Sequence, residues 1–575
     1  MNDLASRARP VTSLSSSSTT RRQFLARIRG GAGAALASSA VSFGSSAQAD
    51  QESSGGTLGT GADRVLDSYQ IRVDAARAEA SIPVPKQRTN GDEQNYPNFI
   101  GNFHKGLPHN KIGEVDRSAY RSFLYAVSQG TAEAFEKVPL GSQGKDQVKL
   151  VNPLAGVAVD LEGTDSHQLA IPAFPSVASQ ALADEAVELY WMALCRDINF
   201  IDYASNPTAL AAVAELSKLK AFKGPRSGGL VGSVTPQTLF RGFTTEDVIG
   251  PYLSQFLLKR FDYGPYAISG TMAMYAPGSD YMTDQASWLA VQNGQGPFAQ
   301  NAVGPVRYTC TGRDLGVYVH TDPNAGLLIS FYNAGVWLFA HNAPLNRGNP
   351  YTKYRTQSGF ATFGVPHFLG LLGEAKQRAC KAVWYAKWFV HRALRPEAYG
   401  GLVHMAVSRK ASYPLDMDVL NSKALASVFS KFGTYFLPQA FPEGSPQHPS
   451  YAQGHASMAG ACATILKAAF DGGAQFNKLE DGNIVVANED GTALIPYTGS
   501  DANQLTVNGE INKLASNIGL ARDFAGIHWR SDYEWGLKLG EAAALSLLRD
   551  QSSNYAGEDF DGFTITKFDG TTVTV

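Results

Sequence analysis

Apolar side chains recur every three or four positions in several windows of the chain. This spacing is clearest at residues 119–127, 181–194 and 207–219. An α-helix turns once in 3.6 residues, so the spacing gathers the apolar side chains on one helical face. The pattern predicts a protein built mostly of amphipathic helices.

Two segments have the alternating, β-branched composition of strands. Residues 482–496 contain an Asp-Gly pair at 490–491, and residues 563–575 contain another at 569–570, between arms rich in Thr and Val. Asp-Gly favours the tight turn of a two-stranded hairpin. We therefore expect two small hairpins at the surface.

The remaining organisation is simple. Long stretches rich in Gly, Pro and Asn, such as residues 276–284 and 342–352, predict ordered loops of the kind that shape pockets. A Gly/Ser-rich segment at 50–61 predicts a flexible lead-in, with regular structure from about Ala62. No repeat of fixed period is present. The predicted class is all-α, with one large helical-bundle domain over residues 50–575 and minor β-hairpins, or alternatively two bundles.

The first 49 residues have the features of an export signal. An Arg-Arg pair within residues 20–25 precedes a weakly apolar run at 30–43 and an Ala-Gln-Ala site at 47–49. This arrangement is typical of twin-arginine signals, which direct folded proteins across a membrane. We expect a periplasmic or secreted protein; the alternative is a disordered basic leader.

Composition narrows the possible partners. Hydrophobic residues make up 44% and charged residues 17% of 575 residues, and the net charge is −2. Such a chain has no electrostatic field that would attract nucleic acid. No unbroken apolar stretch after the leader reaches the 18 to 20 residues of a membrane span. The four cysteines form no CxxC pair, which argues against a zinc or thiol-redox motif and leaves one or two disulfides possible.

Three segments combine positive charge or histidine with helical patterning. In the first, Lys387, His391 and Arg395 follow one another at steps of four and would share one helical face. Pro396 is expected to end the helix near Arg395 and to leave that guanidinium free to reach into a cavity. The alternative is a solvated basic face.

The second segment spans residues 448–460 and begins with a histidine, His448. Pro449 and Gly454 predict a tight entry into a helix of small residues, whose free N–H groups would bind an oxyanion beside His455. The alternative is a capped helix with a hydrogen-bonded histidine.

The third segment contains Arg522, His528 and Asp532. The spacing of four lets the carboxylate orient the imidazole and raise its basicity as a ligand. Arg522 would reach the same cavity if a helix begins after it or if its side chain bends round. The alternative is a surface histidine with an acidic neighbour.

Taken together, the three segments supply two arginines, a lysine, a free helix N-terminus and histidines. This set suits a tetrahedral oxyanion such as phosphate or vanadate, because arginine bonds two oxygens at once and lysine adds a point charge. A hard divalent cation would instead require carboxylate oxygens. The anion site is thus expected within residues 380–535.

The segments resemble those of the vanadium-dependent haloperoxidases, which share an anion site with the type 2 phosphatidic acid phosphatases. The spacing from Lys387 to Arg395 and the sequence around it are similar to the algal and cyanobacterial bromoperoxidases rather than the phosphatases. Further stretches similar to this group span nearly the whole mature chain: residues 90–93, 105–110, 113–116 and 241–256.

The resemblance implies a vanadate cofactor and, by position, a role for each site residue. His528 would bind the metal, and His455 would be the acid-base residue. Lys387 would also polarise hydrogen peroxide, and His448 would lie beside the vanadate. The vanadate oxygens would be held by Lys387, Arg395, Gln453, the Gly454 N–H and Arg522.

The resemblance further implies that halide, with bromide favoured, is oxidised by hydrogen peroxide to hypohalous acid, which halogenates small organic acceptors. A homo-oligomer is also implied. One position departs from the family, because Gln453 replaces the usual serine. Gln453 could bond a vanadate oxygen, turn away and leave water in its place, or reshape the pocket for a particular acceptor. We expect activity to be retained.

Two other functions are compatible with the same residues. One is an acid phosphatase in which His528 is the nucleophile and His455 protonates the leaving group. The other is an oxyanion-binding protein that has lost turnover, with Gln453 marking the loss. The Lys-to-Arg spacing and the upstream similarity favour the haloperoxidase.

Overall fold

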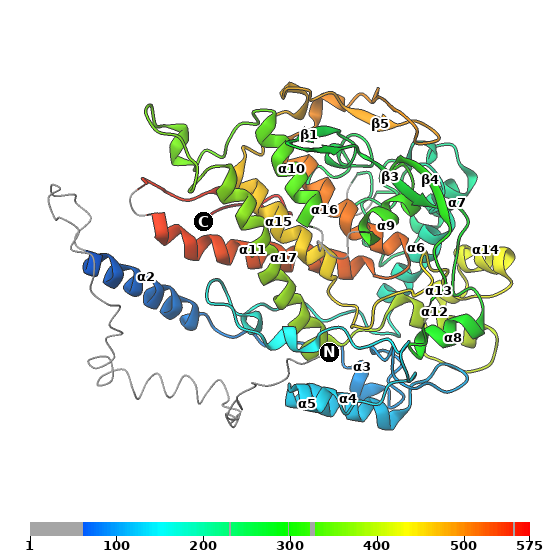
Figure 1. Ribbon diagram of the computed structural model, residues 1–575. Coiled ribbons are helices and arrows are strands. Elements are labelled where there is room, and N and C mark those ends of the chain that lie inside the picture. The colour runs from blue at the N-terminus through cyan, green and yellow to red at the C-terminus, as the bar shows by residue number, and fades with distance from the viewer. Residues whose placement is uncertain (1–60, 229–231, 297, 322–327, 556–557) are drawn as a thin grey trace, which may run out of the picture. The chain divides into compact units, whose positions relative to one another are not determined.

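The computed structural model describes residues 61–228, 232–296, 298–321, 328–555 and 558–575. The chain divides into two compact units, residues 1–68 and 69–575. Of the first unit, the structure describes the first turns of helix α2 (Gly61–Ser81). The second unit contains the remaining elements and is described below (Figure 1). The predicted export signal and most of the Gly/Ser-rich lead-in lie outside the described residues.

The second unit is predominantly helical, as the periodicity predicted. No described helix is both long and apolar enough to cross a bilayer. After α2, the α-helices are α3 (Asp92–Asn95), α4 (Arg117–Gln129), α5 (Ala132–Phe135), α6 (Gln180–Cys195), α7 (Pro207–Leu216), α8 (Gln285–Gln292), α9 (Gly312–His320), α10 (Leu328–Ala340), α11 (Val365–Tyr385), α12 (Pro396–Val407), α13 (Met417–Leu420), α14 (Lys423–Phe432), α15 (Gly454–Ala469), α16 (Val507–Phe524) and α17 (Arg530–Ser552).

The described strands form four separate antiparallel pairs. The two predicted hairpins are confirmed as β5–β6 and β7–β8, with their turn glycines Gly491 and Gly570 at positive φ. The pairs β1–β2 and β3–β4 were not predicted, because their short strands lack clear alternation. The bounds are β1 (Phe261–Tyr263), β2 (Tyr266–Ile268), β3 (Thr271–Tyr275), β4 (Val303–Tyr308), β5 (Val485–Ala487), β6 (Leu494–Pro496), β7 (Thr564–Thr566) and β8 (Thr572–Thr574).

Local sequence explains where the predicted helices begin and end. Asp116 caps α4 by accepting hydrogen bonds from two backbone N–H groups, and Ser179 caps α6 through the Leu182 N–H. Asn206 caps α7, whose first residue is a proline, Pro207. Helix α7 ends at Leu216, three residues earlier than the periodicity predicted. The all-α class with minor hairpins is thus confirmed.

The core of the second unit is built around α15, which contacts α10, α11, α16 and α17 (Figure 1). Every residue of α16 is buried, and so is every residue of α15 except His455. These helices carry little amphipathic character because protein surrounds them on all sides. The four cysteines are free thiols, so no disulfide forms among them.

Glycines allow α15 and α17 to pack with their backbones nearly touching. A Cβ on Gly540 would lie 1.9 Å from the Ser457 carbonyl oxygen, and one on Gly460 would lie 2.3 Å from the Leu537 carbonyl oxygen. Such close packing holds the N-terminus of α15 at a fixed position relative to the start of α17. Both of these helix ends contribute to the site described below.

We predict that Gly540→Ala destabilises the protein by about 3 kcal/mol, because the new methyl group overlaps a backbone oxygen that cannot move alone. Thermal or denaturant unfolding measures the change. Gly370→Ala is the matched control, because nothing lies within 4 Å of a Cβ at that exposed position in α11. The control should be neutral or stabilising by about 0.5–1 kcal/mol. Equal loss in both variants would contradict the proposed packing constraint.

Candidate functional site

The N-terminus of α15 is an uncapped helix end inside the protein. Gln453 occupies the cap position, yet its side chain makes no hydrogen bond to the first turn. A Cβ on Gly454 would lie 3.1 Å from Trp384, so the helix approaches this indole closely. Unpaired N–H groups and the helix dipole together favour an anion at this point. The predicted helix of small residues is present and begins at Gly454.

Lys387 places a buried cation close to this helix end. Its Nζ donates to the carbonyl oxygens of Pro449, at 2.8 Å, and Ser450, at 2.5 Å. No carboxylate of the described residues forms an ion pair with it. Burial lowers the pKa of Lys387 well below its usual value, and the charge of Arg395 lowers it further. An anion would relieve this cost, since it would supply the missing opposite charge.

Arg395 connects two of the predicted histidines. Its Nη1 lies 2.9 Å from His528 Nε2 and 3.0 Å from the Ile527 carbonyl oxygen. Its Nη2 lies 3.0 Å from His448 Nδ1, and its Nε donates to the His448 carbonyl oxygen at 3.0 Å. Burial lowers the pKa of Arg395 to about 9. The guanidinium therefore fixes both histidine segments around one point.

His528 is held by an acid through one ring nitrogen. Its Nδ1 lies 2.6 Å from Asp532 Oδ2. The same oxygen accepts hydrogen bonds from the Ser450 hydroxyl and, at 3.1 Å, from the Trp529 N–H. Because the carboxylate accepts a hydrogen bond from Nδ1–H, the proton of the neutral ring stays on Nδ1 and Nε2 keeps a lone pair for a ligand. The acid–histidine pair predicted from the sequence is present.

The backbone around this pair differs from a single helix. Helix α16 ends at Phe524, Gly526 turns the chain with a φ of 79°, and α17 begins at Arg530. His528 therefore precedes the helix whose first turn contains Asp532. Arg522 lies before the turn at Gly526, so the helix that contains Asp532 begins after it. This is the first of the two ways in which Arg522 was expected to reach the cavity.

Arg522 has few partners in the described protein. Its Nε is buried without a hydrogen-bond partner, and its guanidinium lies 5.8 Å from the centre of the Phe441 ring. Burial lowers the pKa of Arg522 to about 10, although Glu443 and Asp523 oppose this shift. A buried donor without an acceptor is unfavourable, so Arg522 also favours an anion nearby.

His455 is partly exposed in the first turn of α15, and none of the described residues bonds to its ring. Burial lowers the pKa of His455 well below 6.5, and the charges of Arg522 and Lys387 add to this effect. The same factors, with Arg395, lower the pKa of His528. Lys387, Arg395 and Arg522 thus lower the pKa of both histidines, which means that the three cations lie near both His455 and His528. Both imidazoles are therefore neutral, and the clustered cations beside them favour a bound oxyanion, whose negative charge would raise the pKa of both rings.

Comparisons with known proteins give the family. A family model described as the VCPO second helical-bundle domain matches residues 367–554, which contain the site. The vanadium-dependent bromoperoxidase of Ascophyllum nodosum is 34% identical over 538 residues, covering 89% of this chain and 94% of the relative. The chain belongs to the vanadium-dependent bromoperoxidase family. The predicted family is therefore confirmed.

Further relatives agree over the same length. The vanadium-dependent bromoperoxidase of Corallina officinalis is 34% identical over 600 residues, covering 89% of this chain and 98% of the relative. The solved homohexameric structure of the second vanadate-dependent bromoperoxidase (AnII) from Ascophyllum nodosum matches with a TM-score of 0.85 and 31% identity. That match covers 92% of this chain and 93% of the solved one. The chain therefore shares the fold of this bromoperoxidase over most of its length.

Gln453 turns away from the helix end that it precedes. Its side-chain Nε2 donates to the Gly519 carbonyl oxygen of α16 at 2.9 Å, while its Oε1 is buried without a hydrogen-bond partner. Its backbone N–H donates to the Asp532 carbonyl oxygen at 2.9 Å. The side chain therefore turns away from the helix end, which was one part of the three outcomes considered above, and joins α15 to α16.

Sequence reasoning missed Ser450, whose hydroxyl orients Asp532 and whose carbonyl oxygen accepts from Lys387. Its partners lie 82 and 63 positions away in the sequence, so no local pattern could indicate this role. Trp384 is also part of the site, because its ring packs at 4.9 Å on that of His448. The cluster of aromatic residues around Lys387 was the only feature of the sequence that could have indicated a role for Trp384.

The predicted helical stripe of Lys387, His391 and Arg395 is wrong. A π-helical segment, Ala386–His391, replaces the α-helical turn, and Arg395 directly precedes α12, whose first residue is Pro396. The proline therefore begins a helix rather than ending one. His391 is consequently directed elsewhere: its ring packs edge-on against Tyr451 at 4.8 Å, with both nitrogens buried and unpartnered.

This environment makes His391 a source of acid sensitivity. Burial, together with the charge of Arg392, lowers the pKa of His391 to about 3. Between pH 6.5 and 3 the unfolded chain binds a proton here that the folded chain does not, so stability falls as the pH falls. We predict that His391→Phe reduces this loss by about 1.4 kcal/mol per pH unit.

The test is denaturant unfolding of both proteins at several pH values from 7.5 to 4. At pH 7.5, where the imidazole is neutral in both states, the variant should match the wild type to within about 1 kcal/mol. Parallel pH profiles for the two proteins would rule out His391 as the cause.

Proposed function

We propose that the protein is a vanadate-dependent haloperoxidase, which uses hydrogen peroxide to oxidise halide, bromide in preference, to hypohalous acid that halogenates small organic acceptors. Its family membership supports the reaction class. The geometry that supports it most directly is His528, whose Nδ1 is bonded to Asp532 and whose Nε2 faces the guanidinium of Arg395. A single histidine ligand within a set of cations suits an anionic metal oxide.

The residues present fit vanadate. His528 Nε2 would bind the metal, and the oxygens would be held by three cations and the α15 N-terminus through Lys387, Arg395, Arg522 and the Gly454 N–H. Arg522 has a buried donor without a partner, and Lys387 uses two of its three protons. When bound, vanadate supplies a Lewis-acidic centre that activates hydrogen peroxide toward attack by halide, without a haem, a flavin or an electron donor.

The protein's own residues handle protons and position the reactants. His455 is partly exposed and neutral, and the negative charge of a bound anion would raise the pKa of its ring, so a ring nitrogen could then accept a proton from incoming hydrogen peroxide. The remaining proton of Lys387 can polarise the peroxide. His448, held between Arg395 and Trp384, forms a fixed wall beside the anion.

We further propose that the protein is exported and forms a homo-oligomer. The twin-arginine pattern of the first 49 residues supports export to the periplasm or beyond. The AnII relative, which is matched over 93% of its chain, is a homohexamer. Sedimentation of the purified protein and localisation of the expressed chain test these two proposals.

The reaction is tested by reconstituting purified protein with orthovanadate and supplying bromide, peroxide and a dimedone-type acceptor. We expect bromination of the acceptor that requires vanadate, bromide and peroxide. If the protein instead hydrolyses a phenyl phosphate, is inhibited competitively by vanadate and shows no halide turnover, it is an acid phosphatase. Vanadate binding without turnover in any halide would indicate lost activity.

We predict that His528→Ala abolishes vanadate retention, because it removes the proposed metal ligand. His455→Ala should keep the vanadate affinity within about five-fold of wild type and lower bromide turnover by about 10²–10⁴-fold, the usual contribution of an acid-base residue. Equilibrium dialysis measures binding, and the halide assay measures turnover. Equal losses of binding in the two variants would refute this division of roles.

The position of Gln453 gives a further prediction. Because its amide bonds to Gly519 on α16, Gln453→Ala should leave the vanadate affinity within about three-fold of wild type and lower the free energy of unfolding by about 1–3 kcal/mol. Vanadate dialysis and denaturant unfolding are measured on the same preparation. A ten-fold weaker affinity with unchanged stability would show that Gln453 holds the anion.

A further inference from the structure

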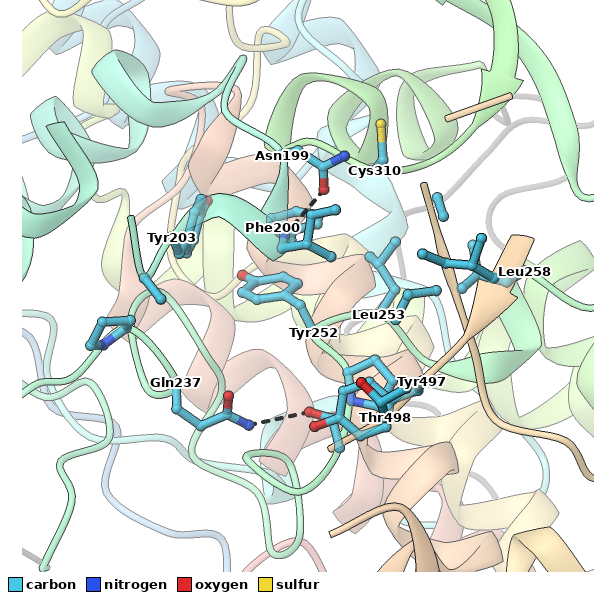
Figure 2. A pocket seen from close by; sticks show the side chains of 18 of the residues that line it. Asn199, Phe200, Tyr203, Gln237, Tyr252, Leu253, Leu258, Cys310, Tyr497 and Thr498 are labelled. Carbon is cyan, nitrogen blue, oxygen red and sulfur yellow. Dashed lines mark hydrogen bonds between the residues drawn. The ribbon is translucent and has the colours of Figure 1, made fainter. Parts of the chain in front are cut away.

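A second cavity, of about 570 Å³, lies apart from the proposed vanadate site. None of the residues assigned to vanadate lines it. Its walls come from the short 3₁₀ turn Phe200–Asp202, from residues 250–253, and from the β5–β6 hairpin with the residues that follow it (Figure 2). A cavity of this volume is typical of small-molecule sites.

Aromatic rings form one wall of this cavity. Phe200 and Tyr252 stack with their ring centres 3.9 Å apart and their planes 4° from parallel. Figure 2 shows these rings, with Tyr497 and Thr498, which directly follow the β5–β6 hairpin, around the same space. The Tyr252 hydroxyl donates to the Phe240 carbonyl oxygen, so this ring is fixed. Rigid stacked rings present a flat apolar surface that favours a planar ligand.

The rim of the cavity is also apolar. Ile201, in the turn Phe200–Asp202, is 45% exposed, and Ile495, in strand β6, is 42% exposed. Ala204 adds a small exposed side chain next to the aromatic wall. Exposed apolar residues around a concave site are typical of places where an apolar ligand enters.

A buried cation sets the charge preference of the cavity. Arg241 lines the wall, and its guanidinium lies 5.2 Å from the centre of the Tyr252 ring. It donates to three carbonyl oxygens, those of Asp247, Gly250 and Pro251, and its Nε has no hydrogen-bond partner among the described residues. The Asp247 carboxylate accepts instead from the Gly242 N–H and the Thr244 hydroxyl. The wall therefore disfavours a cationic ligand.

We propose that this cavity is a binding site for one small planar aromatic molecule, neutral or anionic. The stacked rings supply the flat surface, the apolar rim the entrance and Arg241 the charge selection. The site stands independently of the proposed halide chemistry, because no residue is shared. Its wall does reach the helix of Arg522, since Phe524 packs against both Phe200, at 6.0 Å, and Tyr252, at 6.4 Å.

The test uses three naphthalenes of similar size: 2-naphthol, 2-naphthoate and 2-naphthylmethylammonium. Isothermal titration of the full protein without peroxide should show one 2-naphthol bound, with a Kd on the order of 100 µM. The ammonium compound should bind at least ten-fold more weakly. Absence of 2-naphthol binding at about 1 mM, or equal affinity for the ammonium, would overturn the proposal.

Variants locate the bound molecule. Ala204→Trp and Ala487→Phe fill the cavity from two sides and should each weaken 2-naphthol binding at least ten-fold. Ala426→Trp, at an exposed position of α14 outside the lining, is the matched control and should bind like wild type. Folded cavity variants that bind normally would refute the assignment.

A measurement on the wild type avoids any folding defect of the variants. Hydrogen exchange of the backbone N–H groups in residues 485–498 should slow when 2-naphthol is present. Unchanged exchange there, with binding detected by titration, would place the ligand elsewhere and overturn the proposal.

Discussion

The hydrogen bond between His528 and Asp532 sets the orientation on which the rest of the site depends. The carboxylate holds the Nδ1 side of the ring, so the opposite nitrogen faces Arg395. Ser450 orients the same carboxylate through its hydroxyl and binds Lys387 through its carbonyl oxygen. The loop residue Ser450 thus connects the pair of His528 and Asp532 to Lys387. Movement of this loop would disturb both at once.

Carbonyl oxygens, rather than ion pairs with carboxylates of the described residues, stabilise two cations of the site. Lys387 and Arg395 donate to the carbonyl oxygens of His448, Pro449, Ser450 and Ile527. Carbonyl dipoles satisfy the donors and leave the positive charge in place, whereas a carboxylate partner would neutralise it. The lowered pKa values of Lys387 and Arg395 express the remaining electrostatic cost. A site of this kind has greatest affinity for a ligand that is itself negative.

The sequence predicted the helical class, two hairpins and the segments that form the site, because periodicity, Asp-Gly turns and short motifs are local signals. It did not predict the π-helical segment that contains Lys387 and His391 and turns their side chains in different directions, because the local pattern is that of an ordinary α-helix. The role of Ser450 was also hidden, since its partners are distant in the chain. Gln453 was recognised as unusual, but its hydrogen bond to Gly519 required the position of α16. Local patterns identified residues, while tertiary packing decided their directions.

The main-chain hydrogen bonds of Lys387 and Arg395 tie the charge of the site to the shape of its loop. Lys387 donates to the carbonyl oxygens of Pro449 and Ser450, and Arg395 donates to that of His448. Removal of either cation would therefore take away positive charge and also free part of the loop at residues 448–450. Because that loop carries the Ser450 hydroxyl that bonds Asp532, a change of charge at this site is also a change in the support of His528.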